Sequence, residues 1–268
     1  MVDPAETARG LLEQLGHASA RSIPARDGRE HHLFRVTLPD GERLLKFPRP
    51  DGLADPFDSE RSAAERLRGE AWAIAYATGV EVPPHYAFHD TEPVCSTMGI
   101  LPGITAEIAL ERGQLDEAGL QTVCLRMGQT LAQIHGRKRP ADGGGLPDLP
   151  GGDIATARML HLDYHLGNIM IRPALGAGWQ VSGVVDWTCA RWGPPEADLV
   201  EMQVSVWVSN PRCRDAFIAG YRKVTPRLID ITDVEERAKI EIWRRLVDDP
   251  PLDQQLARRW ADWADTRR

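Results

Sequence analysis

The chain has 268 residues, of which 42% are hydrophobic and 26% charged, and a formal net charge of −7 at pH 7. This length allows one large or two small domains, and this composition is ordinary for a soluble globular protein. The acidic balance argues against a general nucleic-acid binder, which presents a basic surface. Because no apolar run approaches the roughly 18 residues of a membrane span and no signal peptide is visible, we expect a cytoplasmic protein that contacts neither membrane nor nucleic acid.

The first hundred residues predict a sheet with one long helix. An amphipathic helix is expected over 4–16, followed by two strands within 31–47 around a Pro-Asp-Gly turn. A long helix is expected over 56–79, with Asp58 or Ser59 as its N-cap and Gly79 at its end. The segments "PHYAFHD" and "VCSTMGI" then predict a second pair of strands.

The rest of the chain predicts a mostly helical part. A long helix is expected over 114–136, a loop rich in Gly and Pro over 137–153, and two short strands in "NIMIRP" and "WQVSGVVDW". After the Pro-Pro pair at 194–195 the pattern is helical almost to the end. Its apolar faces are expected to pack in a core through Trp207, Phe217, Tyr221, Ile240, Trp243, Leu246, Leu256 and Trp260.

The chemistry of the chain centres on "HLDYHLGNIM" at 161–170 and "VVDW" at 184–187. Phosphoryl transfer requires an acceptor for a hydroxyl proton, ligands for Mg²⁺, and cations on the phosphates. Asp163 is the candidate catalytic base. Asn168 and Asp186 are the candidate metal ligands, because Mg²⁺ prefers oxygen donors and keeps several waters.

A lysine in the first predicted sheet suits the phosphates of a nucleotide. Lys46 lies in the strand "RLLKFP", from which its ammonium can reach the α- and β-phosphates. Glu70 on the long helix is the preferred partner for this lysine, and Glu60 and Glu65 are the alternatives.

These motifs, in this order and over roughly residues 26–205, resemble the aminoglycoside phosphotransferase family, which is related to choline kinases. The matching features are Lys46, Glu70 followed by "VEVPP", "STMGILPG", "LAQIHG", "HLDYHLGN" and "VVDWTCARWGPPEADLV". The resemblance implies an α+β, bilobal protein-kinase-like fold, with a nucleotide-binding lobe at 1–102 and a catalytic, acceptor-binding lobe at 103–268. It also implies transfer of the γ-phosphoryl group of ATP or GTP, with Mg²⁺, to a hydroxyl of a small molecule.

The resemblance assigns further residues by position. The backbone of Gly99 and Leu101 is expected to meet the adenine, with Met98 at the entrance of this hinge. His161 and Asp198 are expected to support the catalytic loop structurally, without taking part in the chemistry.

The chain also departs from the family pattern. Leu162 and Tyr164 replace the usual Gly and Leu of the catalytic loop, and a single glycine, Gly28, marks the best candidate for a phosphate-covering loop at 25–32. Only 25 residues separate His135 from His161, where many family members carry extra helices beside the acceptor. The sequence therefore leaves the acceptor open among aminoglycosides, other antibiotics, amino alcohols, sugars and similar metabolites, and it does not indicate an oligomeric state.

Two other interpretations compete with a kinase. His161, Asp163 and His165 alternate, so on a strand they share one face and could bind a metal ion in a hydrolase. The chain could also be a non-catalytic, nucleotide-binding member of the same fold. The kinase interpretation is preferred because the strand lysine, the candidate base and both candidate metal ligands are present, and His165 is then a loop residue.

Overall fold

In the computed structural model the chain forms two compact units. The first comprises Met1–Leu101 with Asp186–Cys189, and the second comprises Pro102–Val185 with Ala190–Arg268. The structure describes residues 3–25, 30–50, 61–150, 153–174, 178–225, 229–248 and 254–265.

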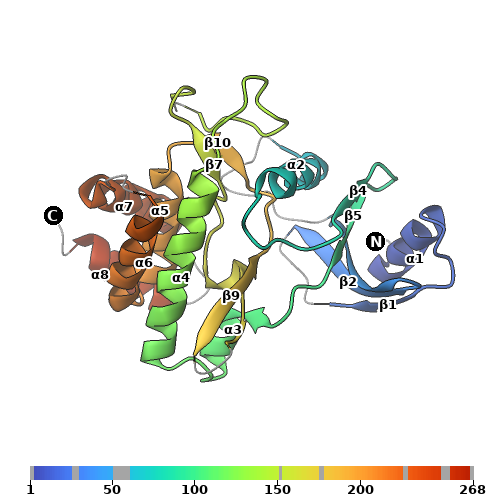
Figure 1. Ribbon diagram of the computed structural model, residues 1–268, viewed down its shortest axis with the longest axis horizontal. Coiled ribbons are helices and arrows are strands. Elements are labelled where there is room, and N and C mark those ends of the chain that lie inside the picture. Colours follow the sequence, from blue (N-terminus) through green and yellow to red (C-terminus); the bar gives the residue numbers. More distant parts are fainter. Residues whose placement is uncertain are drawn as a thin grey trace. The chain divides into compact units, whose positions relative to one another are not determined.

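The first unit is built on a five-stranded antiparallel sheet in the order β1-β2-β3-β5-β4 (Figure 1). The strands are β1 (Arg21–Pro24), β2 (His31–Leu38), β3 (Gly41–Pro48), β4 (Ala87–His89) and β5 (Cys95–Gly99). The helices are α1 (Pro4–Gln14) and α2 (Ala63–Tyr76). Both predicted strand pairs are present, as β2–β3 and β4–β5.

Side-chain alternation along β3 separates the core of this unit from its polar site. Leu45 and Phe47 are buried in a cluster that includes Leu11 and Leu12 of α1. Because successive residues of a strand face opposite sides, Lys46 projects from the other face and reaches α2. One strand therefore supplies both the packing for α1 and the buried cation.

The start of α2 corrects the predicted cap. The helix begins at Ala63 with Ser62 as its N-cap, and Ser62 and Glu65 form a reciprocal capping box. This box satisfies two backbone N–H groups at once, so α2 starts there. Asp58 and Ser59 were the wrong caps, and they lie outside the described residues.

The second unit combines two small sheets with helices. One sheet has the order β6-β8-β9, and β7 pairs with β10 in the other. These strands are β6 (Ile104–Thr105), β7 (Arg158–Leu160), β8 (Ile169–Pro173), β9 (Trp179–Val184) and β10 (Arg191–Gly193). The helical elements are α3 (Ala106–Glu111), α4 (Glu117–His135), the 3₁₀ turn η1 (Leu166–Asn168), α5 (Glu196–Met202), the π-helical turn η2 (Gln203–Trp207), α6 (Pro211–Val224), α7 (Ile231–Asp248) and α8 (Gln254–Asp265).

The predicted core of the C-terminal helices is correct in part. Trp207, Phe217, Tyr221 and Trp260 are buried, and Leu246 and Leu256 pack against the core. Ile240 and Trp243, however, are 72% and 38% exposed. The reason is geometric, because Ile242 is buried. Ile240 is two positions from it, about 200° around the helix axis, and Trp243 is one position from it, about 100° around the axis.

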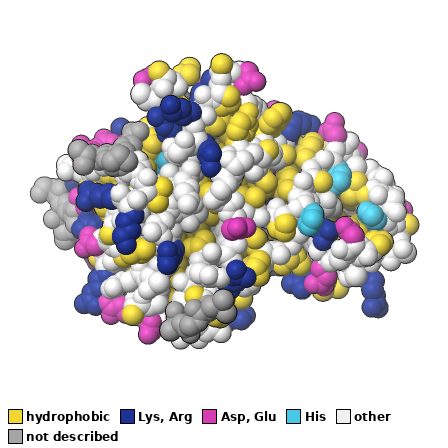
Figure 2. All heavy atoms as spheres, viewed as in Figure 1, with side chains coloured by type: hydrophobic (Ala, Val, Ile, Leu, Met, Phe, Trp, Pro, Cys, Tyr) yellow, Lys and Arg dark blue, Asp and Glu magenta, His cyan; other side chains and the backbone are white. Residues whose placement is uncertain are grey.

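Basic and acidic side chains are interspersed on the face of the molecule shown in Figure 2.

Within the described part of the chain, no helix combines the length and the apolar character needed to cross a bilayer.

Helices α4 and α6 pack with their backbones in direct contact at two glycines. A Cβ added to Gly128 would fall against the carbonyl of Phe217, and one added to Gly220 against the carbonyl of Leu125, both well inside van der Waals distance. Each glycine therefore lets a neighbouring backbone approach where no side chain fits.

We expect Gly128→Ala to lower the free energy of unfolding by about 2–4 kcal/mol, because the helices must separate to admit a methyl group. Urea denaturation measures this change. Gly10→Ala in α1 is the matched control: an added Cβ there meets nothing within 4 Å, and alanine should stabilise the helix by up to about 1 kcal/mol. Equal effects of the two substitutions would contradict the close packing.

Candidate active site

Lys46 is held between two carboxylates in the first unit. Its Nζ lies 3.1 Å from Glu70 Oε1, 3.2 Å from Glu70 Oε2 and 2.9 Å from Asp186 Oδ1. Burial lowers the pKa of Lys46, but the charges of Asp186 and Glu70 outweigh it and raise the pKa above its usual value. The raised pKa favours the charged ammonium, and the three contacts hold it in place.

Glu70 is the partner of Lys46 among the three candidate glutamates. Glu65 is used in the capping box of α2, and Glu60 lies outside the described residues. The Tyr86 hydroxyl donates to Glu70 Oε2 (3.0 Å), and the N–H of Trp187 donates to Oε1 (3.1 Å). Burial raises the pKa of Glu70, and Lys46 opposes that rise.

Asp186 presents one oxygen outward. Lys46 and the Thr188 hydroxyl both donate to Oδ1 (2.9 and 2.8 Å), and no described residue bonds to Oδ2. Burial raises the pKa of Asp186, but the Lys46 ammonium outweighs it and holds the pKa below its usual range. An ionised carboxylate with a free oxygen, on a side chain 44% exposed, suits a hard cation.

Asp163 and Asn168 form a pair in the second unit. Asn168 Nδ2 donates to the backbone carbonyl of Asp163 (2.9 Å) and to Asp163 Oδ2 (2.7 Å). Both of those atoms accept only, so the amide nitrogen must face Asp163 and the amide oxygen faces away. The oxygen is the atom that a magnesium ion requires, so the donor chemistry of Asn168 and Asp186 fits Mg²⁺.

The buried carboxylate of Asp198 anchors the candidate catalytic loop at 161–168. It accepts from the backbone N–H groups of His161 (2.9 Å) and Leu162 (2.5 Å) and lies 2.9 Å from His135 Nε2. Removing it would leave these groups without their acceptor inside the protein, which is costly. Asp198 therefore fixes the backbone just before Asp163.

His161 supports the same loop through both ring nitrogens. Nε2 lies 3.1 Å from the carbonyl of Val185, which can only accept, and Nδ1 accepts from the N–H of Asp163 at 3.3 Å. The neutral Nε2–H tautomer satisfies both contacts. The imidazole thereby ties Asp163 to the end of the β8–β9 hairpin.

The metal-cluster interpretation of "HLDYH" is wrong. Both nitrogens of His161 contact backbone groups, of Val185 and Asp163. His165 Nδ1 accepts from the N–H of Gly167 (3.1 Å) and Nε2 lies 3.3 Å from Asp163 Oδ1. The described part of the chain holds no group of three or more His, Cys, Asp or Glu side chains that could bind a metal ion. His165 is thus a direct neighbour of Asp163, which the sequence alone did not indicate.

The predicted hinge lies at the end of β5. Met98 and Leu101 are buried, and Gly99 donates its N–H to the carbonyl of Pro84 (2.6 Å). The N–H of Leu101 makes no hydrogen bond to any described residue, so it can donate to a base. Residues 26–29 of the candidate phosphate-covering loop at 25–32 lie outside the described residues.

Three supports of the site were not assigned by sequence reasoning: Tyr86 on Glu70, Thr188 on Asp186, and His135 on Asp198. Only His135 carries a sequence signal, because it ends the "LAQIH" segment of the family pattern. A tyrosine and a threonine in these positions have no such pattern around them.

Both the sequence and the structure of this chain are similar to those of known phosphotransferases. The sequence model of the phosphotransferase enzyme family matches residues 22–158 and 155–236. Similar solved structures include aminoglycoside phosphotransferase APH(4)-Ia (TM-score 0.62, 12% identity, 98% of each chain covered) and ADP-bound APH(2'')-Ib (0.60, 12%, 98% of each). Spectinomycin phosphotransferase APH(9)-Ia, with ADP and spectinomycin, matches with TM-score 0.55 and 12% identity over 91% of this chain and 88% of that one. A comparison with curated protein sequences finds no match.

The fold and the family match define an enzyme that transfers phosphoryl groups on an α+β, protein-kinase-like scaffold of two lobes. The chain belongs to the phosphotransferase enzyme family. The family resemblance, the fold class and the enzyme class predicted from the sequence are therefore confirmed, and the non-catalytic alternative is not.

Leu162 stands in the left-handed region, with φ of +61°, where a side chain is disfavoured and glycine is not. This is the position at which the family pattern has glycine. Leu162 thus adopts a backbone conformation that suits glycine better, and in it the Leu162 N–H donates to Asp198.

We expect Leu162→Gly to be more stable than Leu162→Ala by about 1 kcal/mol, measured by urea denaturation. Both variants remove the leucine side chain, so their difference isolates the backbone. Glycine normally lowers stability relative to alanine by a similar amount, so the usual order at this position would contradict the strain assigned to Leu162.

Proposed function

We propose that this phosphotransferase moves the γ-phosphoryl group of ATP or GTP to a hydroxyl group of a small molecule, an antibiotic or a metabolite. The observation that carries the proposal is the Lys46 ammonium held by Glu70 and Asp186. An ammonium has three N–H donors, and they lie within hydrogen-bond distance of both oxygens of Glu70 and of Asp186 Oδ1. A phosphate oxygen would take one of the two contacts now made to Glu70.

In this proposal Asp163 accepts the proton of the acceptor hydroxyl. Its carboxylate is oriented by Asn168 and His165, and its backbone by His161 (3.3 Å). A carboxylate fixed in this way can align the hydroxyl for in-line attack and remove its proton as the bond to phosphorus forms.

Asn168 and Asp186 are the proposed ligands of Mg²⁺, through Asn168 Oδ1 and Asp186 Oδ2. They are linked along the backbone, because the N–H of Val185, the residue before Asp186, donates to the carbonyl of Asn168 (3.0 Å). A bound Mg²⁺ would neutralise charge on the phosphate oxygens. Met98, Gly99 and Leu101 are the proposed contacts of the base.

The acceptor is proposed from chemistry and from the relatives. The solved structures of similar fold include complexes of APH(4)-Ia with hygromycin B and of APH(9)-Ia with spectinomycin. At 12–13% identity this likeness shows the fold alone. We therefore propose only the class of the acceptor, a hydroxyl-bearing small molecule, and a screen of such molecules would identify it.

We expect Asp163→Asn to lower turnover at least ~10²-fold, because the amide cannot accept the hydroxyl proton. ADP release with a panel of hydroxyl acceptors measures turnover, first for the unchanged enzyme. Asparagine keeps an acceptor oxygen for Asn168, so the variant should stay folded and bind ATP. Full activity of the variant would overturn the role of Asp163.

We expect ATP with Mg²⁺ to raise the unfolding temperature by roughly 3–5 °C at ten times its dissociation constant. Asp186→Ala should abolish the Mg²⁺-dependent part of this shift. Asp262→Ala, on the exposed surface of α8, is the control and should retain it. A shift that does not depend on Mg²⁺ in the unchanged protein would contradict the metal ligands proposed here.

A further inference from the structure

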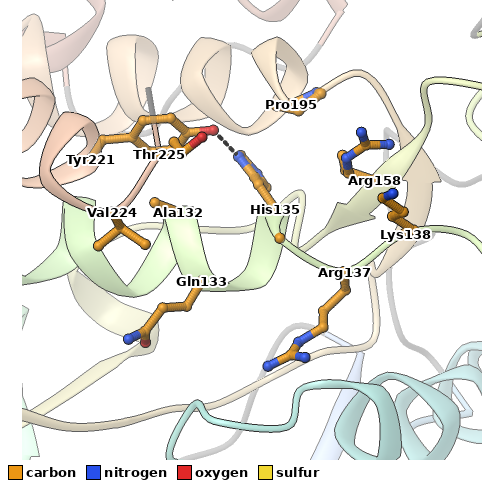
Figure 3. A pocket seen from close by; sticks show the side chains of 11 residues that line it. Ala132, Gln133, His135, Arg137, Lys138, Arg158, Pro195, Tyr221, Val224 and Thr225 are labelled. Atoms are coloured by element: carbon orange, nitrogen blue, oxygen red, sulfur yellow. Dashed lines mark hydrogen bonds between the residues drawn. The ribbon is translucent and has the colours of Figure 1, made fainter. Parts of the chain in front are cut away.

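A pocket of about 490 Å³ is lined by residues of the second unit alone. It is formed by the end of α4 and the residues after it, by β7 and by the end of α6 (Figure 3). Arg137, Lys138 and Arg158 line it, and no Asp or Glu is among its lining residues. None of the proposed nucleotide or metal residues lines it either.

Two of these cations, Lys138 and Arg158, lie opposite each other on paired backbone segments. Lys138 and Arg158 are partners in an isolated antiparallel bridge, and Figure 3 shows their side chains side by side at one end of the pocket. Like charges directly opposite on paired strands destabilise the pairing. Among the described residues, neither cation forms an ion pair with a carboxylate, and Arg158 donates to the carbonyls of Thr156 and Ala157 (2.9 Å each).

The cations are not needed to complete the end of α4. The N–H of Gly136 donates to the carbonyls of Ala132 and Gln133, and the N–H of Arg137 donates to that of Ile134. The carbonyls that a lysine or arginine often satisfies at a helix C-terminus already have backbone partners. Among the described residues Lys138 and Arg158 therefore have no carboxylate partner, and an anion from solution can act as their partner.

We propose that this pocket binds the phosphate group of a small molecule. Arginine presents a planar fork that matches a phosphate, and lysine adds a point charge. An oxyanion bound between Lys138 and Arg158 would attract both cations and so offset the repulsion between them.

The pocket also touches the support of the catalytic loop. His135 lines the pocket, and its Nε2 lies 2.9 Å from the Asp198 carboxylate that holds the loop backbone. A bound phosphate group therefore lies one side chain away from the anchor of Asp163.

Inorganic phosphate is the probe, titrated at constant ionic strength against sodium chloride while the unfolding temperature is measured. We expect a saturable rise of roughly 3 °C in the unchanged protein, and its loss in the double variant Lys138→Gln, Arg158→Gln. Arg126→Gln, on α4 outside the pocket, is the matched control and should keep the rise. Lys46→Ala should keep it too, which separates this pocket from the nucleotide site.

Phosphate also stabilises proteins generally, through exclusion from their surface, but that effect does not saturate and is the same in all variants. An equal shift in the unchanged protein and the double variant overturns the proposal, as does a saturable shift lost only in Lys46→Ala. If the double variant does not fold, Lys138→Gln alone, at an exposed side chain, should weaken phosphate binding at least about fivefold.

Discussion

A lysine ammonium buried between two carboxylates organises the first unit. Water is excluded from Lys46, which is 4% exposed, so its charge is tolerable only where opposite charges and hydrogen-bond acceptors surround it. Glu70 comes from α2 and Asp186 from the segment after β9, so the three residues hold together elements far apart in the sequence. The N–H of Trp187 on Glu70 fixes this arrangement further.

The second unit has the opposite arrangement, in which the single buried carboxylate of Asp198 accepts hydrogen bonds from several N–H groups. Asp198 receives two backbone N–H groups of the candidate catalytic loop and lies beside His135, which in turn contacts the Tyr221 hydroxyl at 2.8 Å. The loop therefore takes its shape from α5, α4 and α6 at once. In the function proposed here, Asp163 would meet the acceptor hydroxyl without rearrangement, and positioning of this kind supplies most of what phosphoryl transfer requires.

The sequence predicted the fold, because the order of its motifs along the chain carried that information. It also singled out Lys46 with Glu70 and Asp163 with Asn168, and each pair is in contact in the structure, while their catalytic roles remain predictions. Tyr86 and Thr188 were not found, because a single hydroxyl that completes a carboxylate can come from almost any nearby segment.

Predictions from local sequence patterns failed where two residues or two helix faces matched the same pattern equally well. Ser62, and not Asp58 or Ser59, is the N-cap of α2, because the glutamate three residues later completes a capping box with it. The preference for a single cap residue does not include this pairwise effect. Ile240 and Ile242 both lie in apolar stripes of α7, and only packing against α5 and α8 decides which stripe is buried.

Local charge balance distinguishes the two polar sites of this chain. Around Lys46 one cation meets two carboxylates, which leaves a single negative charge with an open oxygen on Asp186. In the function proposed here, that oxygen would bind Mg²⁺ and the ammonium would bind a phosphate oxygen. Around Lys138 and Arg158 the described residues supply no carboxylate, and the excess charge is positive. The first site is therefore suited to a metal–phosphate complex and the second to a bare oxyanion, although both present basic side chains.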